Sequence, residues 1–323
     1  MNRQTPVYRP RATSSMLIAQ DDLRALRLLV AQRRLYNRAK RWSFLRWVGF
    51  SIIGVAAPIL TVIVPKASVM VGALAGVWIF LSRTWFSGAE QRLAAKAAGI
   101  QEQFDQLVFG MPEVTRAPSA TMEEVATLVG DDAAVVGQAE KEALKGWYPF
   151  DDRLDGMFSI AIAQRANAAY SERLLNANAQ AWISATLLWV GVAVIAGLMV
   201  GLSLPSFLLG VALPLLPALL DVWEQYRSTK RAGAIRRSMA EDIERFVRGQ
   251  AKRGMAPEDL LLWQDRLYEL RRGSPQVPNL VYKRTRARNE QAMKAAAAEL
   301  ADAALRSAHR DGTLSGGIDG ADY

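Results

Sequence analysis

The sequence contains no cysteine and a single histidine, His309. Without cysteine there is no disulfide framework, no thiolate metal site and no thiol nucleophile. One histidine beside a glycine-rich tail cannot supply the remaining ligands of a zinc site. We therefore expect neither a disulfide-stapled secreted domain nor a bound metal.

Sequence motifs of common enzymes are also missing. The chain has no Walker A loop, no Gly-x-Ser-x-Gly elbow, no His-Glu-x-x-His and no glycine-rich dinucleotide fingerprint. Acidic pairs such as Asp151-Asp152 and Glu258-Asp259 stand at expected helix starts, where capping explains them better than catalysis. We expect no enzyme and no cofactor, and a membrane-embedded hydrolase or transferase is the least favoured hypothesis.

Charge is absent from one very long stretch. Residues 174–220 contain no Asp, Glu, Lys or Arg, and a bilayer-spanning helix needs about 20 mostly apolar residues. The stretch is therefore long enough for two spans. Ser203 and Pro205 suit the first turn of a new helix, which predicts transmembrane helices at 181–202 and 205–223.

A second apolar hairpin lies upstream, with spans predicted at 47–64 and 67–86 and a turn at Pro65-Lys66. The fold class is then an all-α membrane protein: four transmembrane helices in two hairpins, with a helical cytoplasmic domain built from the N-terminal, middle and C-terminal segments. The predicted segments are a basic arm and amphipathic helix (1–46), the first hairpin (47–86), middle helices (87–180), the second hairpin (181–223), C-terminal helices (224–310) and a disordered tail (311–323).

The distribution of basic residues predicts the orientation. Residues 1–46 carry 11 Lys and Arg against two acidic residues, and the two hairpin turns contain only Lys66. By the positive-inside rule, both termini and the middle segment are expected to face the cytoplasm.

Between their interfacial residues the spans carry no Asp, Glu, Lys, Arg or His except Arg83, which can reach the cytoplasmic edge. Proton relays, voltage sensing and transport of charged substrates normally leave ionisable groups at membrane depth. None of these activities is therefore indicated.

Glycine and proline mark two features within the spans. Gly-x-x-x-Gly pairs at Gly72/Gly76 and Gly197/Gly201 indicate close helix packing, inside one protomer or between protomers. Pro214 and Pro217 interrupt the fourth span, where each removes a backbone donor. These two prolines predict either a gating hinge or a static kink.

Basic and aromatic residues gather at two cytoplasmic places, and either group could receive a nucleotide. Arginine offers phosphate a planar fork of donors, and aromatic rings stack on bases. The alternative is that the arginines pair with acidic neighbours and the aromatic side chains pack between helices. The candidate ligand-binding residues are Trp147, Tyr148, Arg165, Asn167 and Arg173 in the middle segment and Arg266, Tyr268 and Arg271 in the C-terminal segment.

Several short motifs, in this order around two hairpins, resemble one known family. They are Ala-Gln-Arg-Arg-Leu-Tyr-Asn-Arg-Ala-Lys at 31–40, Gly-Trp-Tyr-Pro at 146–149, Ala-Gln-Arg-Ala-Asn at 163–167, Gln-Asp-Arg-Leu-Tyr-Glu-Leu-Arg at 264–271 and Val-Pro-Asn-Leu-Val-Tyr at 277–282. The chain is similar along nearly its whole length to the SMODS-associating four-transmembrane family of pore-forming effectors.

That resemblance implies a role in bacterial anti-phage (CBASS) signalling, in which a nucleotidyltransferase makes a cyclic oligonucleotide after infection. Binding of the cyclic di- or trinucleotide on the cytoplasmic side would then lead to membrane permeabilisation and abortive infection. Four helices enclose little water, so we expect a homo-oligomer in contact with membrane lipids, and no DNA or RNA polymer as partner. The alternative function is a passive membrane scaffold that recruits cytoplasmic partners.

Overall fold

The computed structural model describes residues 8–63, 68–114, 120–201 and 203–315. Every regular element in these ranges is helical, which confirms the all-α prediction for this part of the chain. In chain order the elements are α1 (Thr13–Ala19), α2 (Leu23–Ile63), α3 (Ser68–Leu81), the π-helical η2 (Ser82–Phe86), α4 (Ser87–Phe109), α5 (Met122–Val129), α6 (Asp132–Lys141), α7 (Gly156–Met199), α8 (Leu204–Phe207), the π-helical η3 (Leu208–Ala212), α9 (Leu213–Val247), α10 (Pro257–Arg272) and α11 (Asn279–Ser315).

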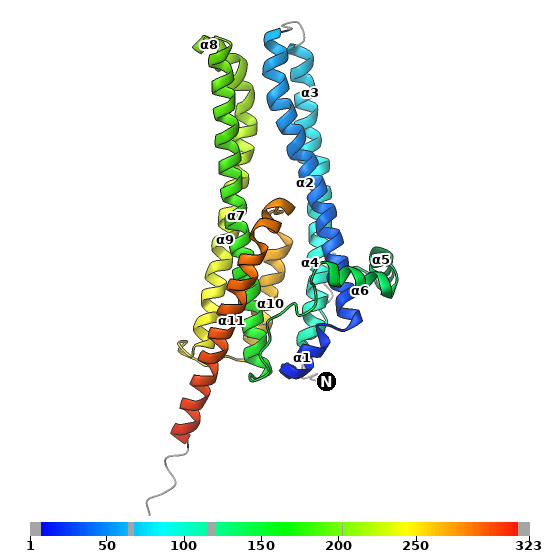
Figure 1. Cartoon of the computed structure of the whole chain (residues 1–323), viewed down its shortest axis with the longest axis vertical. Helices are drawn as coiled ribbons and strands as arrows, with labels where there is room; N and C mark the ends of the chain where they lie inside the picture. The colour runs from blue at the N-terminus through cyan, green and yellow to red at the C-terminus, as the bar shows by residue number, and fades with distance from the viewer. Residues whose placement is uncertain (1–7, 64–67, 115–119, 202, 316–323) are drawn as a thin grey trace, which may run out of the picture.

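Two pairs of long helices form the frame of the molecule (Figure 1). In the first pair, α2 packs against the run α3-η2-α4, and in the second, α7 packs against the run α8-η3-α9. Helix α2 has 41 residues and α7 has 44, so at 1.5 Å per residue they are about 60 and 66 Å long. That is about twice the thickness of a bilayer's hydrocarbon core.

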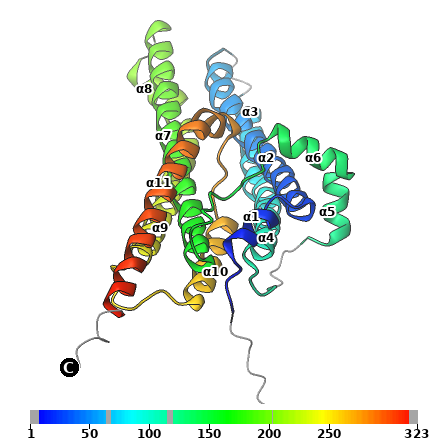
Figure 2. The same cartoon turned by 60° about the horizontal axis from the view of Figure 1, so that its bottom comes forward.

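The shorter helices surround one end of this frame. Helix α10 lies between the two pairs and contacts α4, α7 and α9, while α11 runs along α7. Figure 2 shows α5 and α6 on the side of α2 that faces away from α7 and α11. The N-terminal, middle and C-terminal segments therefore build one helical body at this end.

The helices begin where short-range sequence signals place them. Thr121 and Glu124 form a reciprocal capping box at the start of α5, and the Asp131 carboxylate accepts from the amide of Ala134 at the start of α6. Ser203 caps α8, with proline in its first turn. One expectation was wrong: α7 is capped by Asp155, not by Asp151-Asp152.

The Asp151 carboxylate is occupied by the backbone amide and the guanidinium of Arg153. It is therefore not available to cap α7. Helix α11 also continues to Ser315, past the start of the predicted tail at 311. The turn predicted at Pro65-Lys66 lies outside the described residues.

Buried and exposed apolar side chains occupy opposite ends of the long helices. The body around α10 encloses the core, which includes fully buried Phe104, Phe109 and Met239. Large exposed apolar side chains instead gather at 44–85 and 187–223. Exposed apolar surface of this extent marks a membrane or partner contact.

One helix in the described part of the chain, α7, is long and apolar enough to cross a membrane. Only 6% of its most apolar window is buried inside the protein. A core helix of a water-soluble domain would be mostly buried at such a window, so the exposure of this one favours contact with lipid.

The pair Gly72/Gly76 makes no close helix contact within the described chain. A Cβ added at Gly72 or Gly76 would contact nothing within 4 Å, although Gly197 is buried. Gly201 corrects our expectation, because it lies beyond the end of α7 with φ +69° and forms the turn instead. Packing at Gly72 and Gly76 between protomers stays a prediction.

The proline pair follows a widened helical segment. The π-helical η3 immediately precedes Pro214, which lies in the first turn of α9. A local change of helix type such as this provides hydrogen-bond partners for backbone groups that a proline leaves unpaired. The side chains of Pro214 and Pro217 lie outside the described residues, and their gating role stays a prediction.

Candidate functional site

Three of the candidate ligand residues, Tyr148, Asn167 and Arg271, meet in one buried polar network. Arg271 Nη1 lies 2.6 Å from Asp105 Oδ2, and the Tyr148 hydroxyl donates to Asp105 Oδ1 at 2.6 Å. Asn167 also makes a side-chain hydrogen bond to Tyr148. The network joins α4, α7, α10 and the segment between α6 and α7.

Buried glutamines extend the same network. Gln264 on α10 donates to Glu102 Oε2 at 2.7 Å and to Asp105 Oδ2 at 2.9 Å. Gln164 on α7 donates to Gln264 Oε1 at 3.0 Å. These amides orient the two carboxylates toward Arg271 and tie α10 to both helix pairs.

The charges of this network compensate one another, although Arg271 Nε, Arg271 Nη2 and Gln164 Oε1 are buried without a hydrogen bond to any residue that the structure describes. Burial alone lowers the pKa of Arg271, but the charges of Asp105 and Glu102 hold it above its ordinary value. Burial and the adjacent Asp105 carboxylate raise the pKa of Tyr148 well above its usual range. Arg271 is thus charged and Tyr148 neutral, and both are already engaged in packing the core.

The remaining candidates are dispersed. Arg165 pairs with Glu244 at 2.9 Å, and Arg266 lies 3.8 Å from Asp242. Arg173 is exposed on α7, and Tyr268 is buried on α10. Trp147 packs edge-on against Phe104, with 6.4 Å between ring centroids. Ligand binding by all of these residues stays a prediction.

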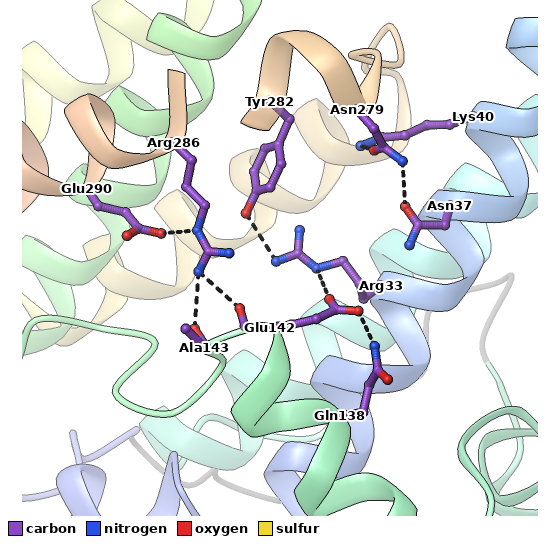
Figure 3. A network of polar contacts seen from close by, with 10 residues as sticks. All are labelled: Arg33, Asn37, Lys40, Gln138, Glu142, Ala143, Asn279, Tyr282, Arg286 and Glu290. Carbon is purple, nitrogen blue, oxygen red and sulfur yellow. Dashed lines mark hydrogen bonds and ion pairs between the residues drawn. The ribbon is translucent and has the colours of Figure 1, made fainter. Parts of the chain in front are cut away.

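A second polar network surrounds Tyr282 where α2, α6 and α11 meet (Figure 3). Arg33 donates to the Tyr282 hydroxyl at 3.1 Å and pairs with Glu142 at 2.9 Å. Arg286 donates to the Glu142 carbonyl at 3.0 Å, and Lys40 donates to Asn279 at 2.9 Å. This network fastens α11 to the first helix pair.

Three cations contact the ring of Tyr282: the charged groups of Arg33, Lys40 and Arg286 lie 5.0, 5.5 and 6.0 Å from its centroid. Burial, followed by the charge of Arg33, lowers the pKa of Lys40 to about 8. The segments 31–40 and 277–282 are two of the motifs on which the family resemblance is based, but neither motif indicates that the two segments contact each other.

A cavity of about 870 Å³ lies between the two helix pairs. On one side it is lined by α2, η2 and the start of α4, and on the other by α9, the end of α10 and the loop 273–276. It contains the aromatic side chains of Trp47 and Phe50. We name it the junction cavity, since it lies where the exposed apolar stretches meet the helical body around α10.

Comparison with known proteins identifies the family. The profile of the SMODS-associating 4TM effector domain matches residues 14–300. The chain belongs to this family. It is therefore a membrane protein of the general class of anti-phage effectors. No curated protein and no solved structure matches it.

In this 4TM effector, ion pairs across the junction cavity connect elements distant in the sequence. Arg83 on η2 pairs with Asp221 on α9, so this pair joins the two helix pairs directly. Arg46 Nη1 lies 3.2 Å from Glu90 Oε2 within the first pair. Burial raises the pKa of Glu90, although Arg46 opposes the shift.

Sequence reasoning missed the junction cavity of this effector. Arg46 and Arg83 were seen only as membrane-flanking charges, and α10 gave no sign that its end closes a cavity against α9. The available signal was Asp221, an acidic residue directly after the uncharged stretch, which favours a cationic partner.

Proposed function

We propose that this protein is a ligand-gated effector that permeabilises the bacterial inner membrane. Its two helix pairs cross the membrane as four spans, with both termini in the cytoplasm. A cyclic di- or trinucleotide binds its cytoplasmic helices and changes how the spans pack. The family match to SMODS-associating effectors supports the class of ligand.

The observation that carries this proposal is the continuity of the long helices. Helix α7 contains both Gln164 of the buried polar network and the exposed apolar window that suits a lipid surface. The predicted boundaries at 46/47, 180/181 and 223/224 all fall inside single helices. A shift in the cytoplasmic body therefore moves a span as one rigid element.

The composition of the spans fits a pore that is closed without ligand. Their only ionisable residues are Arg83 and Asp221, which pair with each other at the ends of their spans, so conduction needs a hydrophobic or Ser/Thr-lined path that opens by rearrangement. Two helix pairs enclose little water by themselves. We infer that several protomers assemble around the conducting path.

The test is dye release from liposomes that contain the full chain, titrated with cyclic di- and trinucleotides. Linear dinucleotides of the same bases serve as the matched ligand control. Release by one cyclic nucleotide supports the proposal. If the protein is confirmed to be inserted in the liposomes but no nucleotide of the panel releases dye, the passive scaffold is the better explanation.

A further inference from the structure

We propose that the junction cavity is the binding site for the phosphodiester ring of the activating ligand. This inference rests on the proposed function and gives it a location. It differs from the location that the sequence favoured, because the predicted residues of the middle and C-terminal segments do not line this cavity.

The size and lining of the cavity suit such a ligand. Small-molecule sites in proteins have volumes of about 300–1,000 Å³, and the junction cavity has about 870 Å³. Trp47 and Phe50 offer aromatic faces at its wall. The charged lining consists of four arginines, two of which pair with acidic residues, and four acidic residues: Arg46, Arg83, Arg92 and Arg272, with Glu90, Asp221, Glu224 and Glu269. Aromatic faces and guanidinium groups are the side chains that bind bases and phosphates.

Polar atoms at the wall lack partners in the described structure. Trp47 Nε1 and Ser82 Oγ are buried and make no hydrogen bond with any described residue, and the residue Ser82 is itself fully buried. Buried polar groups normally have partners. Nucleobase edges carry both donors and acceptors, so a bound base can satisfy groups of these kinds.

Two arginines are available for phosphate. Arg92 is exposed and makes no ion pair or hydrogen bond with any residue that the structure describes. Arg272 is half exposed and lies 3.9 Å from Glu269, too far for a hydrogen bond. A phosphodiester between them would form charge-assisted bonds without first breaking a close ion pair.

The position of the cavity connects binding to the spans. Its walls come from both helix pairs, and the Arg83–Asp221 pair bridges them at the same level. A bound phosphate competes with Asp221 for Arg83. Occupation of the cavity therefore loosens the direct bridge between the two helix pairs.

The experiment measures equilibrium binding of radiolabelled cyclic di- and trinucleotides to the full chain in detergent. The test variant is Arg92→Ala/Arg272→Ala. The matched control is Arg231→Ala/Arg288→Ala, which removes the same charge from exposed positions outside the cavity. We expect the test variant to bind at least about tenfold more weakly than wild type and the control to bind like wild type, with equal melting temperatures.

Anionic phospholipid headgroups carry the same phosphodiester chemistry, so a second arm uses nanodiscs with and without phosphatidylglycerol. Loss of nucleotide binding in the test variant in both nanodiscs supports the assignment. If the substitutions weaken only lipid association and leave nucleotide affinity intact, the cavity is a lipid site and the ligand assignment is overturned.

The remaining outcomes separate this inference from the proposed function. If a cyclic nucleotide binds wild type and the test variant with equal affinity and causes equal dye release with both, only the assignment of the site to the cavity is overturned. Absence of both binding and dye release across the panel for wild type overturns the proposed function, and this inference with it.

Discussion

Replacement of Arg271 by alanine is expected to destabilise the protein severely, because the Arg271 guanidinium is the cation for two buried carboxylates. Asp105 is fully buried, and its Oδ2 lies 2.6 Å from Arg271 Nη1, while Glu102 Oε2 lies 3.7 Å away. Removing one partner of a buried ion pair typically costs about 3–5 kcal/mol. For a chain of 323 residues that corresponds to a fall in Tm of about 4–7 °C.

The assay is thermal unfolding followed by tryptophan fluorescence, at one scan rate and in one detergent. The matched control is Arg266→Ala on the same helix, whose side chain is 45% exposed and 3.8 Å from Asp242. Exposed pairs contribute about 1 kcal/mol at most. We therefore expect a small change in Tm for the control.

A third variant separates charge burial from loss of packing. Arg271→Ala/Asp105→Asn also removes the closer of the two carboxylates that lose their cation, so it should recover part of the lost stability. If Arg271→Ala melts like Arg266→Ala, the network does not hold the core together. In that case Arg271 is available for ligand, as the sequence motif suggested.

Two further predictions concern charges outside that network. The variants Arg83→Asp and Asp221→Arg each replace the ion pair between the two helix pairs by two like charges. Without ligand, each variant should leak dye about fivefold faster, because the half-exposed pair stabilises the closed arrangement by about 1 kcal/mol. The double reversal should restore sealing, and a double variant as leaky as either single one contradicts the bridge. The pKa of Lys40 is about 8 in the folded protein against 10.5 ordinarily, so between pH 7 and 9 the folded state loses this proton while the unfolded state keeps it. From pH 7 to pH 9 the free energy of unfolding of wild type should therefore rise by about 1 kcal/mol relative to that of Lys40→Met. The measurement is the difference in Tm between the two proteins at each pH. If this difference does not change with pH, Lys40 is not desolvated.

Local signals in the sequence were enough to place most helix ends. Thr121 with Glu124, Asp131 and Ser203 each act within one helical turn, so their effect does not depend on the rest of the fold. Asp155 was missed because three acids precede α7, and only the side-chain contact of Arg153 decides which of them is free to cap it.

The partners of the candidate site residues could not be predicted in this way. Arg271 and Asp105 are far apart in sequence, and their contact depends on how α10 enters between α4 and α7. The alternative that arginines pair with acidic neighbours correctly described Arg165 with Glu244. The junction cavity depends on the spacing of two helix pairs, which no periodicity within one helix encodes.

The way the buried network is assembled has a consequence for synthesis. Asp105 is translated early, but its partners Gln264 and Arg271 on α10 emerge only after both apolar stretches have left the ribosome. Until then Asp105 lacks its Arg271 partner, and the helical body is incomplete. A nascent or truncated chain without α10 therefore lacks the network that joins the two helix pairs.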